Sequence, residues 1–383
     1  MTKKPSYRFE GYTKSWEEKK LGEIIDINSG ESPAKFHEGY TPYVKVDDLN
    51  YCDKYLTTTK TYVDTNNKVK KIEKGSIVFP KRGAAILTNK IRILNTKAYM
   101  DTNMMSLSTD KSNLEFLYTV ISNVGLYKIA DTSTIPQINN KHILPYTVSL
   151  PSLPEQTAIG SFFQDTDQLI SLQQRKLEVL KEQKKTYLKL LFPAKGQTKP
   201  ALRFAGFEDE WKEVKVSDIF RVTRGQVLAT TEISAEKTDT HKYPVYSSQT
   251  KNEGLLGYYD KYLFETAITW TTDGANAGTV NYREGKFYST NVNGVLLSDE
   301  GFANKVIAEI LNNEAWKYVS KVGNPKLMNN VMSEISLVIP NDFREISTLS
   351  TFFQDLDKAI AKQEEKVNQL KESKQTLLRK MFI

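Results

Sequence analysis

Residues 162–192 read FFQDTDQLISLQQRKLEVLKEQKKTYLKLLF, and residues 352–382 read FFQDLDKAIAKQEEKVNQLKESKQTLLRKMF. From residue 161 onward, 15 of the 32 pairs aligned at an offset of 190 residues are identical. Both stretches lack glycine and proline, are rich in Leu, Lys, Gln and Glu, and carry apolar residues at helical spacing. Each stretch therefore predicts one long helix, and the chain contains that helix twice.

Heptad seams run along both predicted helices. The first helix has the series Ile170, Leu177, Lys184, Leu191 and Thr166, Gln173, Leu180, Tyr187; the second has Ile360, Val367, Lys374, Met381 and Leu356, Gln363, Leu370, Leu377. Polar residues occupy equivalent seam positions, and such residues fix register and orientation. We expect the two helices to pair as an antiparallel coiled coil, with the partner-facing and spacer positions Ile170, Leu177, Leu180, Lys184, Ile360, Val367, Leu370 and Lys374. A charged helix packed on its own domain is the alternative.

A second repeat precedes each helix. Arg8-Phe9-Glu10-Gly11-Tyr12 and then Trp16 return, shifted by 195 residues, as Arg203-Phe204-Ala205-Gly206-Phe207 and then Trp211. Between the matched blocks the copies diverge, although Gly83-Ala84 faces Gly274-Ala275 and Thr102-Asn103 faces Thr290-Asn291. We interpret the chain as a tandem duplication of a unit of roughly 190 residues. The recurring Arg-Phe and Trp positions are expected to pack within the shared scaffold.

The regions before each helix predict mixed α/β domains. Short β-prone runs occur at 77–79, 91–94, 267–270 and 295–297, and short helices fit 114–122 and 303–311. The fold class is therefore α/β, in the mixed α+β sense, with a variable domain plus a long helix duplicated in tandem and the two helices paired as an antiparallel coiled coil. The expected boundaries are 1–153 and 196–342 for the two variable domains, and 154–195 and 343–383 for the helices.

Composition narrows the class of protein. The 383 residues carry 53 basic and 46 acidic side chains, a net charge of +7, which favours an anionic partner such as nucleic acid. One cysteine, Cys52, excludes an internal disulfide, and no apolar run is long enough to span a bilayer. No secretory segment opens the chain. We expect a cytoplasmic protein that does not enter a membrane.

Catalytic patterns are missing from the sequence. It has no GxxxxGK[ST] loop, HExxH, GxSxG or CxxC pattern, and no adenosylmethionine-binding glycine loop. Its three histidines, His37, His142 and His241, lie far apart and show no metal-ligand spacing. We therefore expect no catalytic residue, no metal and no cofactor in this chain.

Binding chemistry remains in the two variable regions. Lys and Arg neutralise phosphates, Arg also binds guanine, and Asn or Gln binds adenine. Polar, turn-rich loops of this composition occur in both copies, although each such residue is also consistent with a solvated turn. The candidate DNA-binding residues are Lys81, Arg82, Thr88, Asn89 and Lys90 in the first copy, and Ser247, Ser248, Gln249, Lys251, Asn252, Thr272 and Asn276 in the second.

The duplicated plan resembles the specificity subunit of type I restriction-modification systems over essentially the whole chain. The resemblance lies in the two Arg-Phe and Trp openings, in Pro154-Glu155-Gln156, and in the Phe-Phe-x-Asp-x-Asp start of both helices. Residues 243–248 and 273–280 are also similar to runs in many target-recognition domains. One departure is Phe343-Arg344-Glu345-Ile346, where the second copy lacks the Pro-Glu-Gln triplet and the start of its helix is in question.

The resemblance implies a non-catalytic subunit whose two target-recognition domains each read half of a split double-stranded DNA sequence. The paired helices would hold these domains apart and dock two modification subunits, which methylate adenine N6. Restriction subunits would join and cleave unmethylated DNA. Adenosylmethionine, ATP and magnesium would then belong to the partner subunits. The alternative function is a coiled-coil scaffold or adaptor whose two variable domains bind proteins.

Overall fold

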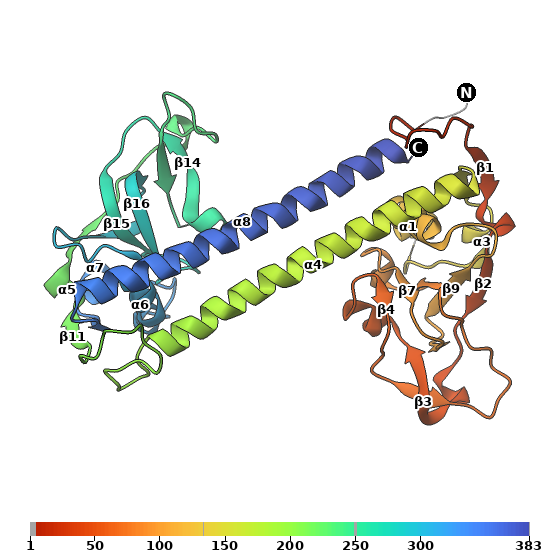
Figure 1. The fold of residues 1–383 in the computed structure, drawn as a ribbon, viewed down its shortest axis with the longest axis horizontal. Helices are drawn as coiled ribbons and strands as arrows, with labels where there is room; N and C mark the ends of the chain where they lie inside the picture. The colour runs from red at the N-terminus through yellow and green to blue at the C-terminus, as the bar shows by residue number, and fades with distance from the viewer. Residues whose placement is uncertain (1–4, 133, 249–250, 383) are drawn as a thin grey trace. The chain divides into compact units, whose positions relative to one another are not determined.

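The computed structural model describes residues 5–132, 134–248 and 251–382. The chain folds into two compact units, and each unit takes residues from both long helices. Unit 1 comprises Met1–Lys176 and Glu364–Ile383, and unit 2 comprises Leu177–Gln363. Figure 1 shows a mixed β-sheet domain in each unit, beside segments of the helices α4 and α8.

Unit 1 contains three small sheets. A five-stranded sheet has the order β2-β9-β6-β7-β4, a three-stranded sheet the order β5-β3-β8, and β1 pairs with β10. The strands are β1 (Glu17–Lys20), β2 (Asp26–Ser29), β3 (His37–Val44), β4 (Tyr55–Leu56), β5 (Tyr62–Asp64), β6 (Ile77–Pro80), β7 (Arg92–Leu94), β8 (Tyr99–Met100), β9 (Met104–Ser108) and β10 (Thr147–Leu150). The helices are α1 (Leu114–Val124), α2 (Leu126–Ile129) and α3 (Asn140–Ile143).

Unit 2 contains a six-stranded sheet and a two-stranded one. The larger has the order β12-β17-β15-β16-β13-β14, and β11 pairs with β18. The strands are β11 (Lys212–Lys215), β12 (Arg221–Arg224), β13 (Tyr243–Tyr246), β14 (Leu255–Tyr259), β15 (Phe264–Thr271), β16 (Val280–Ser289), β17 (Asn293–Leu297) and β18 (Ser336–Ile339). The short helices are α5 (Val216–Ile219), α6 (Lys305–Ala315) and α7 (Asn329–Ser333).

The duplication is visible in these elements. The order β2-β9-β6 in unit 1 matches β12-β17-β15 in unit 2, with every pair antiparallel. An asparagine caps the equivalent helix in each unit: Asn113 accepts from Phe116 N–H at 3.0 Å, and Asn304 accepts from Ile307 N–H at 3.1 Å. All four predicted strands and both predicted short helices are confirmed, although α6 begins two residues later than expected. The mixed fold class is thus confirmed.

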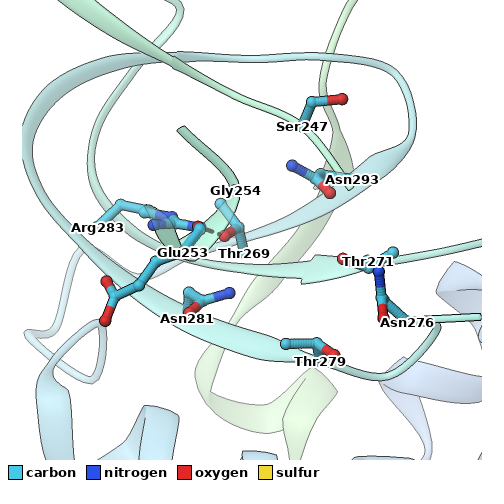
Figure 2. A pocket seen from close by; sticks show the side chains of 10 residues that line it. All are labelled: Ser247, Glu253, Gly254, Thr269, Thr271, Asn276, Thr279, Asn281, Arg283 and Asn293. Carbon is cyan, nitrogen blue, oxygen red and sulfur yellow. Dashed lines mark hydrogen bonds between the residues drawn. The ribbon is translucent and has the colours of Figure 1, made fainter. Parts of the chain in front are cut away.

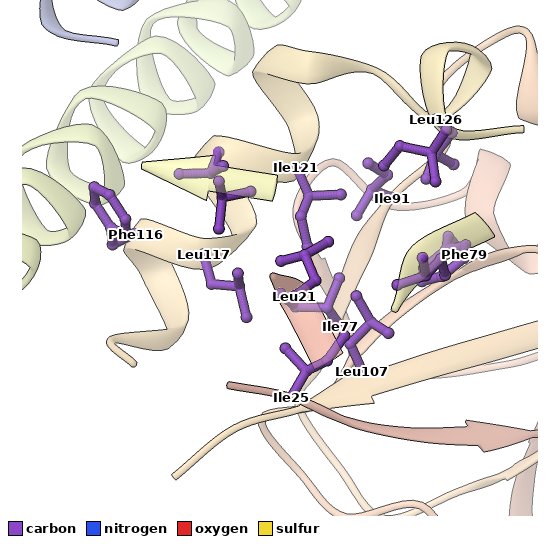
Figure 3. Packing of buried hydrophobic residues seen from close by; sticks show 14 of the residues in the cluster. Leu21, Ile25, Ile77, Phe79, Ile91, Leu107, Phe116, Leu117, Ile121 and Leu126 are labelled. Carbon is purple, nitrogen blue, oxygen red and sulfur yellow. The ribbon is translucent and has the colours of Figure 1, made fainter. Parts of the chain in front are cut away.

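The core of unit 1 lies between α1 and the five-stranded sheet. Figure 3 shows Phe116 and Leu117 of α1 on one side and Ile77 and Leu107 of the central strands β6 and β9 on the other, all at most 1% exposed. Because β6 is buried along its whole length, the loop that follows its carboxyl end is attached to a firmly packed strand.

The two long helices are α4 (Leu153–Leu191) and α8 (Phe343–Met381), each 39 residues. Within unit 1, Lys374 and Lys371 of α8 contact Asp167 and Gln174 of α4, so the two segments run antiparallel. All sixteen residues of the predicted seam are buried or half-buried. The eight predicted partner-facing positions are among them.

Aromatic residues at the helix ends explain why the duplicated sequence is so similar there. In unit 1, Phe163 near the start of α4 packs on Phe382 after the end of α8, with ring centroids 5.9 Å apart. In unit 2, Phe353 of α8 packs on Phe192 after α4, at 5.5 Å. A phenylalanine near the start of one helix therefore meets a phenylalanine just after the end of the other in both units, as antiparallel pairing requires.

A buried ion pair fixes the start of each long helix to its domain. Arg8 donates from Nε and Nη2 to the two oxygens of Glu155, at 2.8 and 2.6 Å, and Arg203 does the same to Glu345 at 2.7 Å for both bonds. Both glutamates are 1% exposed. The expected scaffold role of the repeated Arg-Phe pair is thus confirmed. In the second copy Glu345 takes the role that Glu155 has in the first, although the Pro-Glu-Gln triplet is missing there.

A charge cluster joins the domain of unit 1 to both helices. Lys54, which is 6% exposed, lies 2.7 Å from a Glu115 oxygen on α1 and 3.1 Å from an Asp167 oxygen on α4. Lys374 of α8 contacts the other oxygen of Asp167. Two cations and two carboxylates therefore surround one another where the domain meets the helix pair.

Unit 2 builds the same cluster from different domain residues. Lys184 of α4 contacts Glu309 and Asp357, both at 2.8 Å, and Lys305 of α6 contacts the same two carboxylates at 2.9 and 2.6 Å. Burial alone would raise the pKa of Asp357, but Lys305 and Lys184 hold it below its ordinary value. The helices contribute an aspartate and a lysine at equivalent positions in both units, whereas each domain contributes its own lysine and glutamate.

Candidate functional site

The first candidate residues lie on the loop that leaves β6. The backbone of Lys81 is fixed by two hydrogen bonds of 2.8 Å, from Lys81 N–H to Asn103 C=O and from Ile138 N–H to Lys81 C=O. The side chain of Arg82 is exposed and that of Lys81 is half-buried. The structure thus presents two neighbouring cations on a backbone anchored to the sheet.

The same turn recurs in unit 2. Gly83 and Gly274 have φ values of +93° and +91°, and their N–H groups donate to Pro136 C=O and Pro325 C=O at 2.8 and 2.9 Å. The two residues before each glycine therefore hold equivalent places: Lys81 and Arg82 in unit 1, Thr272 and Asp273 in unit 2. One scaffold turn carries different chemistry in the two units.

Alanine in place of Gly83 tests the importance of this turn. The backbone of Gly83, with ψ of −177°, lies in a region that is essentially restricted to glycine, so we expect Gly83→Ala to destabilise unit 1 by about 1–3 kcal/mol. An added Cβ would meet no atom within 4 Å, so the cost is one of backbone strain alone. Urea denaturation measures it, with the exposed neighbour Ala84→Ser as control. Equal stability of the two variants would contradict the prediction.

The other candidates in unit 1 follow this turn. Asn89, with φ of +51°, donates to Ser122 C=O at 2.8 Å and accepts from Leu126 N–H at 2.9 Å, so its amide joins the loop to the α1–α2 turn. The Thr88 hydroxyl donates to Ala85 C=O at 3.0 Å, and Lys90 Nζ contacts Asn50. These three residues shape the loop, whereas Lys81 and Arg82 offer charge on its surface.

In unit 2 the structure brings three candidates together. Asn276 donates to Ser248 C=O at 3.2 Å, and Ser247 and Asn276 line the same cavity. Lys251 and Asn252 belong to a short turn, η6 (Lys251–Gly254), in which Asn252 has φ of +48°. Gln249 lies outside the described residues.

Thr272 lies apart from those residues, in a charged group that sequence reasoning missed. Its hydroxyl donates to Asp273 Oδ2 at 2.6 Å, and Arg224 Nη2 lies 3.4 Å from the same oxygen. Lys326 Nζ lies 3.8 Å from the other oxygen of Asp273. Arg224 ends β12, about fifty residues before Asp273, so their spacing in sequence gave no signal of this contact.

A polar cavity lies beside these loops. It has a volume of about 250 Å³ and lies between β15, β16 and the loops that carry Ser247 and Asn276 (Figure 2). Its other polar lining residues are Glu253, Thr269, Thr271, Thr279, Asn281, Arg283 and Asn293, and sequence reasoning selected none of them as a candidate. Several groups on its wall can therefore form hydrogen bonds.

Within 5–132, 134–248 and 251–382, no group of three or more His, Cys, Asp or Glu side chains is placed to hold a metal ion. No helix in those ranges is both long and apolar enough to cross a membrane.

Comparisons with known proteins agree on one family. The model of the type I restriction modification DNA specificity domain matches residues 13–182 and again 208–372. The N-terminal part of a putative type I specificity subunit of Mycoplasma pneumoniae is 40% identical over 129 residues, which are 33% of this chain and 67% of that protein. Another putative type I specificity subunit of that organism is 30% identical over 215 residues, 55% of this chain and 76% of that protein.

The matched length differs among the relatives, and a solved structure shares the fold. Two further relatives in M. pneumoniae match over only 34% and 52% of their own length. The crystal structure of a type I restriction-modification S subunit from M. genitalium superposes with a TM-score of 0.70 at 15% identity, covering 100% of this chain and 99% of that one, a likeness in fold. With two copies of the specificity domain over most of its length, the chain belongs to the family of type I restriction-modification specificity subunits.

Proposed function

We propose that this chain reads a two-part double-stranded DNA sequence, one half with each domain, as the non-catalytic subunit of a restriction-modification complex. The observation that carries the proposal is the repeated turn, which carries Lys81 and Arg82 in one unit and Thr272 and Asp273 in the other. Arg82 is exposed, whereas Thr272 is 1% exposed and Asp273 contacts Arg224 and Lys326. Two copies of one scaffold with unlike loops suit two unlike half-sites, because side chains distinguish bases by their donor and acceptor patterns. We assign residues 1–153 and 196–342 as the two recognition domains.

The long helices would serve as spacer and docking surface. Each is 39 residues and therefore about 58 Å long at 1.5 Å per residue, more than one turn of B-DNA at about 34 Å. The helix segments 154–195 and 343–383 would also bind two modification subunits, and restriction subunits would join the assembly. Adenosylmethionine, ATP and magnesium would act in those partners, in the cytoplasm, where the DNA is accessible.

Substitutions in the loops should affect the two half-sites separately. Alanine at Lys81 or Arg82 is expected to weaken discrimination in one half of the sequence about 5- to 150-fold, because a good base contact is worth about 1–3 kcal/mol. Alanine at Asn276 or Gln249 should act on the other half alone. The methylated motif and the salt dependence of DNA binding by the assembled complex measure both effects. Lys97→Ala, on an exposed surface ion pair, is the control. Unchanged recognition in all four variants would contradict the assignment.

Lengthening both helices should lengthen the gap between half-sites. Lys184 of α4 contacts Asp357 of α8 in unit 2, so the positions just after Gln183 and just after Lys358 lie at the same level of the helix pair. Insertion of three heptads after Gln183 and three after Lys358 keeps the seam in phase and adds about 32 Å, or about nine base pairs, close to one turn of DNA. We expect a motif with unchanged halves and a longer gap. An equally long Gly-Ser insertion should give no fixed gap, and an unchanged gap in the folded heptad variant would refute the spacer role.

The proposed function is tested by co-expression with a cognate modification subunit and single-molecule sequencing of methylated adenines in host DNA. One two-part motif with a fixed gap is expected. A stable co-purified complex that adds no methylation would favour the scaffold alternative, in which the domains bind proteins.

A further inference from the structure

The cavity of unit 2 holds an arginine whose charge has no carboxylate partner. Arg283 of β16 is only 4% exposed, and in the described part of the chain no carboxylate lies within ion-pair distance of it. Burial lowers the pKa of Arg283, although Tyr246 and Glu253 act in the opposite direction. Arginine nevertheless stays protonated in proteins, so the cavity wall carries a buried positive charge. Such a charge is costly unless acceptors surround it.

The guanidinium is held in one orientation. Its Nε donates to the Thr269 hydroxyl at 3.1 Å and its Nη2 to Glu253 C=O at 2.6 Å. Its central carbon lies 3.7 Å from the centre of the Tyr246 ring, which packs against one face. Two of the five N–H groups are used in these bonds. The group is therefore rigid before any ligand arrives.

Other polar groups on the wall are available to a ligand. Asn281 and Thr279 line the cavity, and the structure gives their side chains no hydrogen bond to any residue it describes. Figure 2 shows the Asn281 amide between Glu253 and Thr279. An amide offers both donors and an acceptor, and a hydroxyl offers one of each kind. The wall thus combines a fixed cation with groups that can match a polar ring.

We propose that this cavity takes one nucleobase, guanine in particular, unstacked from the DNA sequence that unit 2 reads. The inference rests on the proposed function. Guanine O6 and N7 are adjacent acceptors suited to a guanidinium, and Asn281 can bond another edge of the ring. At about 30 Å³ per water the cavity of about 250 Å³ has room for about eight waters, which is space enough for one planar base. Among the lining residues that the structure describes there is no lysine, whereas Glu253 is one of them, which disfavours a phosphate.

Nucleoside binding to the full chain tests the proposal, because a free nucleoside requires no unstacking. Guanosine, adenosine, cytidine, thymidine and inorganic phosphate are each titrated and followed by saturation-transfer NMR. We expect saturable binding of guanosine, stronger than that of the other three. Arg283→Gln and Asn281→Leu should each weaken it at least about tenfold. The exposed Asn313→Leu on α6 is the matched control and should leave it unchanged.

Several results would overturn the inference. These are the absence of saturable guanosine binding to the native chain, binding that survives both cavity substitutions, and displacement of guanosine by phosphate, which would assign the cavity to an anion. Arg283→Gln disrupts internal hydrogen bonds, so Asn281→Leu, which breaks none, separates loss of the site from loss of the fold. If the co-expressed complex methylates a two-part motif and neither variant changes a base of that motif, DNA reading stands and only the cavity assignment fails.

Discussion

Glutamine in place of Glu345 is expected to lower the free energy of unfolding of unit 2 by about 3 kcal/mol. Glu345 is 1% exposed and receives two hydrogen bonds from Arg203 at 2.7 Å. The substitution keeps the shape of the side chain but leaves a mostly buried guanidinium without its anion, and breaking such a pair costs about 3–5 kcal/mol. The expected loss of about 3 kcal/mol lies at the low end of this range because the side-chain oxygen of the glutamine can still accept one hydrogen bond from Arg203.

The measurement is urea-dependent hydrogen exchange of the peptides that cover unit 2, which reports the stability of one unit separately. Glu334→Gln is the matched control, since Glu334 pairs with Lys215 at 2.7 Å on an exposed surface, where such pairs are worth about 0–1 kcal/mol. Similar losses for the two variants would show that the buried pair has no special importance.

Methionine in place of Lys54 is expected to have a comparable effect on unit 1, about 3 kcal/mol. Lys54 contacts both Glu115 and Asp167, and its removal leaves two mostly buried carboxylates with Lys374 as the remaining cation of the cluster. Methionine retains much of the apolar stem, so the change isolates the charge. We also expect the exchange protection of α8 near Lys374 to fall.

Lys97→Met is the control for this change, because Lys97 pairs with Glu73 at 2.9 Å and both side chains are about 60% exposed. Thermal unfolding and hydrogen exchange of unit 1 check the prediction. A Lys54→Met variant as stable as Lys97→Met would mean that the cluster contributes nothing to joining domain and helices.

The helices and the duplication could be predicted because they depend on local pattern. The apolar helical spacing predicted α4 and α8 to within a few residues of their ends, although α4 also includes Pro154 and Gly160 near its start. The four predicted strands were also present, because runs such as 77–79 are buried and β-prone. The same spacing could not tell that Lys184 in the seam would bind Glu309 of the neighbouring domain, or that Lys374 would bind Asp167 of the other helix.

The site was less predictable, since it depends on contacts between distant residues. Arg283 and Asn281 lie in a strand whose sequence carries no binding motif, and only folding places them beside Ser247 and Asn276. Conversely, Asn89 has a residue type suited to bases, yet its amide is engaged with Ser122 and Leu126. Residue type suggests a kind of chemistry, but which atoms remain available to a ligand is decided by tertiary hydrogen bonds.

The composition of unit 1 has a consequence for synthesis on the ribosome. Its core includes Leu378 and Met381, and Tyr7 N–H donates to Lys380 C=O at 3.0 Å. Unit 2 draws on residues 177–363 alone, so all of its residues emerge before the last twenty that unit 1 requires. The amino-terminal domain, although translated first, is completed last, and until then its apolar surface is a target for chaperones.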